Sequence, residues 1–363
     1  MNNQKPNLFA KDTTKFNQLI FKVSITLFIA IIFVVFFLSF GGLATFEPAR
    51  YVDYFKNYEF QLHTIDVENG DAFLLRLPND KVMLIDCGDS EYEDRVLSYI
   101  SQFMKSENLQ KIDYFILTHT DSDHIGNASA IINKFNVVNL YRPKIYSKDE
   151  EKLLSQNEGY KVESSKTYND VILSAYAKGC NIIFNEAGLS ISLSYCQIDF
   201  LSPNLNDYAN DNDYSAVVML KYFSTKILFM GDASSQVEES LIDKYGNDLQ
   251  ADILKIGHHG SKSSTSNEFL QAVKPKYAIL SCGDNSSILP NNEVITLLEN
   301  NNIHILSTMK LQNFAISIYL GDIAFKAQDA YFNYWAIIFV VLTIVVVILF
   351  KIDFSPNKVT KKW

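Results

Sequence analysis

The stretch LTHTDSDH, residues 117–124, joins the end of a buried strand to four possible metal ligands. The apolar run 112–117 predicts the strand, and the ligand candidates follow it within six positions: His119, Asp121, Asp123 and His124. Imidazole and carboxylate together suit Zn²⁺ or Mn²⁺, whereas Ca²⁺ prefers oxygen alone. This spacing allows His119 and Asp121 to bind one ion, and Asp123 and His124 another. The alternative is a polar loop in which Asp123 caps the next helix, but a cap needs only one such residue.

Other polar residues also stand where predicted strands end. The pair His258-His259 follows the strand-like run 253–256, Asp232 follows 227–230, and Asp86 follows 82–85. Alone, each Gly-Asp or His-Gly step is no more than a turn signal. Polar ligand types at four strand ends form a collective pattern, and that pattern favours a shared site.

The rest of the chain between residues 47 and 330 alternates short apolar strands with amphipathic helical patterns. Residues 147–180 are polar and weakly periodic, which indicates an insertion or a lid. The apolar fraction of 48% can supply a full core and rules out a disordered chain. We therefore expect one mixed α/β domain over residues 47–330.

Two charge-free runs flank this domain, at residues 23–46 and 331–350. Each is long enough to cross a bilayer as a helix. The outer tails, 1–22 and 351–363, carry eight Lys and two Asp. Because basic residues favour the cytoplasmic side, we expect both tails there and the domain outside the cytoplasmic membrane. The whole chain has a net charge of −9, so the segment between the tails carries −15.

The motifs resemble the metallo-β-lactamase superfamily, and more narrowly the hydrolase domain of ComEC-type competence proteins. The similarity rests on Ile65 to Ala72, Leu84 to Asp86 with Gly88, the 117–124 stretch, Asn212 to Leu220 and the segment LKIGHHGSK at 254–262. It covers roughly residues 61–318. The resemblance implies an αββα metallo-β-lactamase-like sandwich, here flanked by two transmembrane helices.

The resemblance also implies a site for two divalent metal ions, Zn or Mn. The metal ligands would be His119, Asp121, Asp123, His124, Asp232 and one residue of the second histidine pair. Asp232 would bridge the ions and Asp86 would support them from outside. Between His258 and His259 we favour His258 as the ligand, with His259 and Asp123 as catalytic residues. Lys262 and the neighbouring serines would hold a phosphate, or else belong to a solvated loop.

This chain departs from the family pattern at Leu289, where a histidine is usual, and at Glu68-Asn69. Two spans also cannot form the channel of a DNA importer. Three functions stay open: a phosphodiesterase or nuclease acting on single-stranded DNA, an esterase of envelope phosphodiesters such as phosphocholine-bearing teichoic acid, and a catalytically decayed tethered binding protein. Cys180 and Cys196 could form a disulfide across a hairpin, although free buried thiols are the favoured interpretation.

Overall fold

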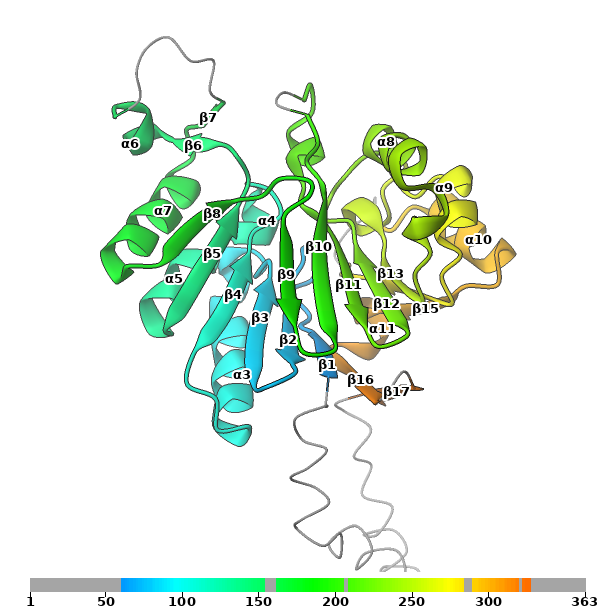
Figure 1. Cartoon of the computed structure of the whole chain (residues 1–363), viewed down its shortest axis with the longest axis horizontal. Helices are drawn as coiled ribbons and strands as arrows, with labels where there is room; N and C mark the ends of the chain where they lie inside the picture. The colour runs from blue at the N-terminus through cyan, green and yellow to red at the C-terminus, as the bar shows by residue number, and fades with distance from the viewer. Residues whose placement is uncertain (1–59, 154–160, 206–207, 284–288, 320–321, 328–363) are drawn as a thin grey trace, which may run out of the picture. The chain divides into compact units, whose positions relative to one another are not determined.

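The computed structural model describes residues 60–153, 161–205, 208–283, 289–319 and 322–327, which form two β-sheets with helices on their outer faces (Figure 1). The first sheet has the order β17 (Asp322–Ala327), β16 (Phe314–Tyr319), β1 (Phe60–Thr64), β2 (Phe73–Leu77), β3 (Lys81–Ile85), β4 (Ile112–Ile116), β5 (Val137–Arg142) and β8 (Asn181–Phe184). The second has the order β15 (His304–Ser307), β14 (Tyr277–Leu280), β13 (Ile253–Lys255), β12 (Thr225–Phe229), β11 (Val217–Tyr222), β10 (Cys196–Ser202) and β9 (Ser190–Leu193). A small parallel pair joins β6 (Tyr146–Ser147) to β7 (Val162–Glu163).

Helices cover the outer face of each sheet (Figure 1). Beside the first sheet lie α3 (Glu93–Ser106), α5 (Ala128–Lys134) and α7 (Lys166–Lys178), and beside the second lie α8 (Ser235–Tyr245), α9 (Asn267–Val273) and α10 (Asn292–Asn300). Shorter helices are α4 (Ser122–Ile125), α6 (Lys148–Glu151), α11 (Thr308–Leu311), η2 (Ser90–Tyr92), η3 (Asp211–Tyr214), η4 (Gly246–Leu249) and η5 (Gly257–Gly260).

The central strands are buried on both faces, which explains their nearly unbroken apolar sequences. In β3, Met83 and Ile85 belong to the core between the sheets, whereas Val82 and Leu84 belong to the core beneath the helices. Phe73 and Phe229 meet edge to face across the two sheets, with ring centroids 5.4 Å apart. This layering is the predicted αββα sandwich.

One expectation was wrong. The predicted insertion or lid at 147–180 contains α7, a regular outer helix that buries Tyr168, Val171, Ile172 and Ala175. Ser174 on α7 and Ser129 on α5 share a hydrogen bond of 2.8 Å. Polar side chains on the solvent face of α7 weakened its periodicity in the sequence, but its buried face belongs to the helical layer.

The predicted membrane spans at 23–46 and 331–350, and both tails, lie outside the described residues. Within the described part of the chain, no helix is long and apolar enough to cross a bilayer.

Candidate metal centre

The polar residues singled out in the sequence meet at one edge of the sandwich. Asp86 follows β3 and His119 follows β4, and these two strands pair in parallel. Asp232 follows β12 and the His258-His259 pair follows β13, and these strands are also parallel. The carboxyl ends of parallel strands share one edge, so each sheet contributes half of the cluster.

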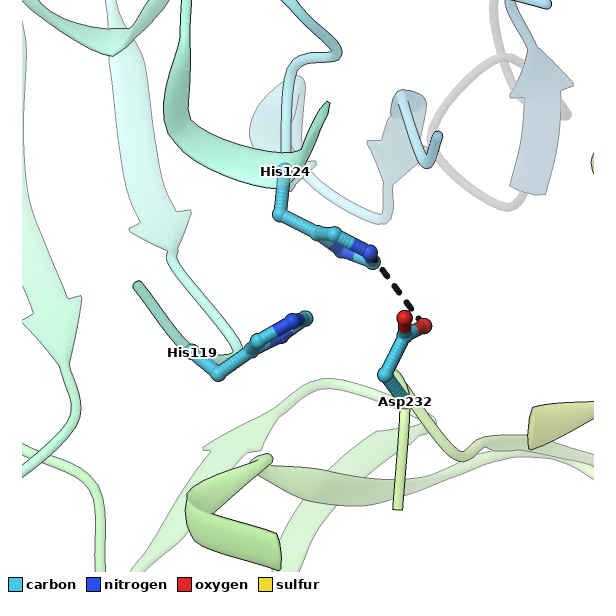
Figure 2. Close-up of side chains that lie close together, drawn as sticks. All are labelled: His119, His124 and Asp232. Carbon is cyan, nitrogen blue, oxygen red and sulfur yellow. Dashed lines mark ion pairs between the residues drawn. The ribbon is translucent and has the colours of Figure 1, made fainter. Parts of the chain in front are cut away.

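Three side chains, His119, His124 and Asp232, form the centre of the cluster (Figure 2). Nε2 of His124 lies 3.2 Å from Oδ1 of Asp232. Nε2 of His119 and Oδ1 of Asp232 are buried, yet neither makes a hydrogen bond. A buried polar atom without a hydrogen bond is costly, so Nε2 of His119, and Oδ1 of Asp232 in addition to its ion pair with His124, fit a bound cation.

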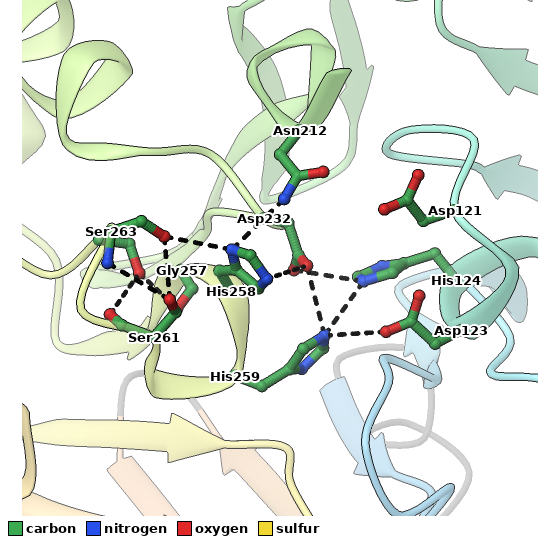
Figure 3. A network of polar contacts seen from close by, with 12 residues as sticks. Asp121, Asp123, His124, Asn212, Asp232, Gly257, His258, His259, Ser261 and Ser263 are labelled. Atoms are coloured by element: carbon green, nitrogen blue, oxygen red, sulfur yellow. Dashed lines mark hydrogen bonds and ion pairs between the residues drawn. The ribbon is translucent and has the colours of Figure 1, made fainter. Parts of the chain in front are cut away.

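A second group consists of Asp123, His124 and His259 (Figure 3). Nε2 of His259 lies 3.2 Å from Nε2 of His124, 3.5 Å from Oδ2 of Asp123 and 3.4 Å from Oδ2 of Asp232. Ligand atoms about 2.1 Å from a tetrahedral ion are roughly 3.4 Å from one another. The spacing of these atoms therefore fits a metal ion.

The Nδ1 atoms of the three buried histidines are engaged away from the cluster. Nδ1 of His124 lies 2.7 Å from Oδ2 of Asp86, and Nδ1 of His259 lies 2.9 Å from the carbonyl oxygen of Ser281. Nδ1 of His119 lies 3.0 Å from Oγ1 of Thr118. When Nδ1 carries the proton, Nε2 presents its lone pair to the cluster, as in metal-binding histidines.

Asp86 acts as the support predicted from the sequence. It is buried, its Oδ1 accepts the Thr118 N–H at 2.8 Å, and its Oδ2 accepts the Thr118 hydroxyl at 2.6 Å. Because that same hydroxyl oxygen can accept from His119, Asp86 orients both His119 and His124.

His258 lies at the outer side of the cluster and is 30% exposed. Its Nδ1 lies 3.3 Å from Nδ2 of Asn212 and 3.3 Å from Oγ of Ser263 (Figure 3). The amide nitrogen can only donate, so Nδ1 accepts and Nε2 carries the proton. Burial lowers the pKa of His258, which favours this neutral form. The geometry thus brings His259, not the favoured His258, among the candidate ligands.

Asp121 stands at the start of α4, where its side chain makes no cap hydrogen bond. It is 48% exposed, and its Oδ2 lies 3.7 Å from Nε2 of His119. It therefore lies at the solvent side of the cluster, while Asp123 and His124 on α4 reach inward.

Two buried residues near the site were missed as site residues. Nζ of Lys255, which is fully buried, lies 2.5 Å from Oδ2 of Asp71 and 4.0 Å from Oδ1 of Asp232. Oδ1 of Asp71 lies 3.7 Å from Nδ1 of His259. A lysine within an otherwise apolar strand, β13, was the available signal, because lysine is almost never buried without a partner.

Neighbouring charges strongly shift the pKa values of the histidines and of Asp232 in the cluster. Burial alone would lower the pKa of His124, but Asp232 and Asp86 raise it well above the usual range. His259 behaves similarly, and Asp232 raises its pKa to about 9. Burial would raise the pKa of Asp232, but His259 and His124 hold it well below its usual value. The buried cluster thus contains both positively charged histidines and negatively charged carboxylates.

The remaining candidates lie around the cluster. Lys262 forms an exposed ion pair with Glu293, 2.5 Å apart, so its charge is already partnered. Leu289 precedes Pro290, whose Cβ lies 3.1 Å from the place that a Cβ on Gly260 would occupy. The four cysteines are free and buried, so Cys180 and Cys196 form no disulfide.

Comparison with known proteins gives a consistent assignment. The model of the metallo-beta-lactamase superfamily matches residues 65–191 and 196–284. ComE operon protein 3 of Bacillus subtilis is 29% identical over 274 residues, which cover 69% of this chain and 32% of that protein. Recombination protein 2 of Haemophilus influenzae is 29% identical over 62% of this chain and 24% of its own length. Competence protein ComA of Neisseria gonorrhoeae is 26% identical over 64% of this chain and 29% of its own length. The chain thus spans about a third or less of these relatives.

Solved structures resemble this chain more distantly. The metallo-beta-lactamase fold protein YhfI from Bacillus subtilis is 12% identical, with a TM-score of 0.42 over 70% of this chain and 98% of that one. CmlA, a diiron beta-hydroxylase from Streptomyces venezuelae, is 11% identical, with a TM-score of 0.47 over 70% of this chain and 53% of that one.

Proposed function

The chain belongs to the metallo-β-lactamase superfamily, and we propose that it is a membrane-anchored, metal-dependent phosphodiesterase acting outside the cytoplasmic membrane. The relative named competence protein ComA, together with the ComEC-like motifs of the sequence, supports a phosphodiester substrate such as single-stranded DNA. The charge-free runs at residues 23–46 and 331–350, with basic tails beyond them, support the anchoring.

One observation carries the enzymatic part of this proposal. Three buried histidines have Nδ1 held by oxygen atoms, and their Nε2 atoms converge on carboxylates. A structural core would not leave Nε2 of His119 unpartnered. A metal ion bound to these Nε2 atoms and carboxylates would account for the arrangement.

We assign the ligands by their positions. His119, Asp121 and Asp232 would hold one divalent ion, and Asp123, His124 and His259 the other, with Asp232 shared between them. Zn²⁺ or Mn²⁺ bound there would supply a hydroxide near neutral pH, because a bound Zn²⁺ alone can lower the pKa of its water to about 7. This assignment exchanges the roles that the sequence suggested for His258 and His259.

The chain's own residues would then act on the substrate. Asp123 keeps 35% of its side chain exposed, so it can accept a proton from the attacking water. His258 directs its Nε2–H toward the outer side of Asp232, where it can donate to a phosphate oxygen as charge develops. Ser263, beside His258, fixes the imidazole in this orientation.

The electrostatics favour a short contact with one phosphodiester over a long track for a nucleic-acid backbone. The segment between the tails carries −15, and tracking a backbone requires a row of free cations. Near the site, Lys262 pairs with Glu293 and Lys161 pairs with Asp211. Recognition would therefore rely on the metals, which also suits an esterase of envelope phosphodiesters such as teichoic acid.

The test uses the full chain purified in detergent. Metal content is measured first, and then hydrolysis of single-stranded DNA and of bis(p-nitrophenyl) phosphate with added Mn²⁺ or Zn²⁺. An Asp121→Ala/His124→Ala variant is the matched control. We expect bound metal and hydrolysis of a phosphodiester, with both reduced in the control.

The possible results of this test distinguish the candidate functions. Hydrolysis of the small ester without DNA cleavage would favour the envelope esterase. A protein with almost no Zn or Mn and no activity above the control would instead be a tethered binding protein, and the enzymatic proposal would be wrong.

A further inference from the structure

Three exposed aromatic side chains lie at one end of the sandwich. Tyr195 is 54% exposed, Phe223 is 41% exposed and Tyr319 is 40% exposed. Tyr195 and Phe223 stand in the turns that follow β9 and β11, and Tyr319 is the last residue of β16. We call these three residues the aromatic rim. Large apolar groups that are exposed together at one end of a domain can mark a contact with a membrane or a protein.

Turn chemistry does not explain two of these residues. Tyr195 has φ 62° and Phe223 has φ 49°, a left-handed conformation that favours Gly or Asn. Their rings stack with centroids 4.9 Å apart and an interplanar angle of 9°. The N–H of Phe223 donates to the carbonyl oxygen of Tyr195 at 3.1 Å, which joins the two turns. A bulky residue in this conformation points to a role in function.

Two rim residues, Phe223 and Tyr319, directly follow residues that contact Phe60 at the start of β1, the first strand of the described domain. Phe60, which begins β1, stacks on Tyr222 at 5.3 Å, and Phe223 follows directly. Phe60 also pairs with Ile318, the neighbour of Tyr319. The turns of β9–β10 and β11–β12 lie together at the lower end of the strands in Figure 1. The rim therefore lies where the chain enters the domain.

The length of chain outside the described domain limits how far this end can be from an anchor. Thirteen residues, 47–59, separate the first charge-free run from Phe60. Only three residues separate Ala327, at the end of β17, from residue 331. At about 3.5 Å per residue, the second connection spans on the order of 14 Å. The second connection therefore holds the β16–β17 hairpin, and with it the paired strand β1, near any membrane that the second run enters.

Charge beside the rim fits a lipid surface. Lys221 and Lys226 are directly opposite each other, one step inside the β11–β12 turn. Like charges in that arrangement are unfavourable in a sheet that faces water alone. Asp199 neutralises Lys221, with 2.8 Å between their charged atoms. Lysine stems can lie along apolar surfaces and bring their charges to lipid headgroups, which would apply here to Lys226, because Lys221 is paired with Asp199.

We propose that the aromatic rim lies in the headgroup region of the bilayer and orients the domain on the membrane. The proposal rests on the membrane anchoring proposed above. Tyrosine and other aromatic side chains are enriched at this depth because one end is apolar and the other polar. Residues Tyr195, Phe223 and Tyr319 would act together as one contact, beside the two anchors.

This orientation narrows the substrate class. Thr225 begins β12 at the rim end, and Asp232 lies beyond its other end. Five strand residues at about 3.4 Å each separate the rim from the metal centre by roughly 17 Å. The candidate site would thus open away from the bilayer. Its substrate would be a phosphodiester in solution or in the cell wall, not a lipid headgroup.

The test measures the depth of a single tryptophan in the full chain reconstituted into phosphatidylglycerol–phosphatidylethanolamine vesicles. Trp335→Phe and Trp363→Phe remove the native tryptophans, and Phe223→Trp introduces the probe. Leu153→Trp, at a position exposed on α6's side of the domain, is the matched control. Tyr195→Trp provides a second probe if the first variant fails to fold. Brominated lipid is then added as the quencher.

We expect brominated lipid to quench the tryptophan at 223 about twice as strongly as that at 153. Equal quenching in protein that floats with the vesicles would overturn the rim proposal and leave the anchoring intact. Protein that does not float would overturn the anchoring and this proposal with it. Protection of position 223 from acrylamide without lipid quenching would assign the rim to a protein contact, and would also overturn the proposal.

Discussion

The ammonium group of Lys255 and the carboxylate of Asp71 form a buried ion pair of 2.5 Å beneath the candidate metal centre. Removal of one partner leaves the other buried without its nearest opposite charge. We expect Lys255→Met to lower the free energy of unfolding by about 3–5 kcal/mol. Urea unfolding with EDTA present measures this loss apart from any metal effect.

Lys276 provides the control for this prediction, because its pair with Asp252 is exposed. Lys276→Met should cost less than about 1 kcal/mol. A second change, Asp71→Leu, should recover part of the loss caused by Lys255→Met. Equal effects of Lys255→Met and Lys276→Met would contradict the buried pair.

The carboxylate of Asp86 orients two candidate ligands through Thr118 and His124. Asp86→Asn keeps the size of the side chain but replaces one oxygen by a donor, which cannot accept from His124. We expect metal affinity to fall about 10- to 100-fold with little change in fold. Competition with a chromogenic chelator measures the affinity.

Asp243, near the end of α8, is exposed, so Asp243→Asn serves as the control. An Asp86→Asn protein that binds metal as tightly as this control would show that His124 needs no such support.

The strand ends and the first histidine cluster were predictable because parallel strands place their carboxyl ends at one edge. Which of His258 and His259 lies among the candidate ligands was not predictable. It depends on the backbone of η5, where both residues have φ between 45° and 48°, and no periodicity in the sequence shows such a turn. Lys255 was missed because an apolar run hides a single charge whose partner, Asp71, is remote in sequence.

Gly126, two residues after His124, illustrates a further limit of sequence reasoning. Its φ of −53° is ordinary, so backbone conformation does not require glycine. A Cβ there would lie 2.8 Å from the backbone carbon of Asp89 and closer still to Ser90 N. We expect Gly126→Ala to cost about 1–3 kcal/mol by overpacking. Thermal unfolding checks this, with Ser122→Ala, at an exposed position of the same motif, as the neutral control.

Metal binding should release protons from His124 and His259. Asp232 raises the pKa of His259 to about 9, and the pKa of His124 is also well above the usual range. A raised pKa means that the metal-free histidines hold protons at neutral pH, whereas a metal requires their neutral form. The binding constant should therefore rise with pH, about tenfold per pH unit for each proton displaced, and the part of this rise that comes from His259 should level off above about 9.

Calorimetry in two buffers of different ionisation enthalpy counts the released protons. His258→Ala should leave the count unchanged, because burial lowers the pKa of His258. Binding that is independent of pH below about 9 would contradict the proton-filled state of the cluster.

The two adjacent histidines should respond oppositely to substitution. Nε2 of His259 lies 3.4 Å from Asp232 and 3.5 Å from Asp123, whereas Nε2 of His258 lies 3.8 Å from Asp232 and its ring is partly exposed. His259→Ala removes a candidate ligand, so we expect loss of one metal equivalent per chain. His258→Ala removes only a donor to the substrate, so metal content should persist while kcat falls about 10²- to 10³-fold. Metal analysis beside kinetics on bis(p-nitrophenyl) phosphate separates the two effects, and loss of metal in His258→Ala with retention in His259→Ala would restore the assignment made from sequence alone.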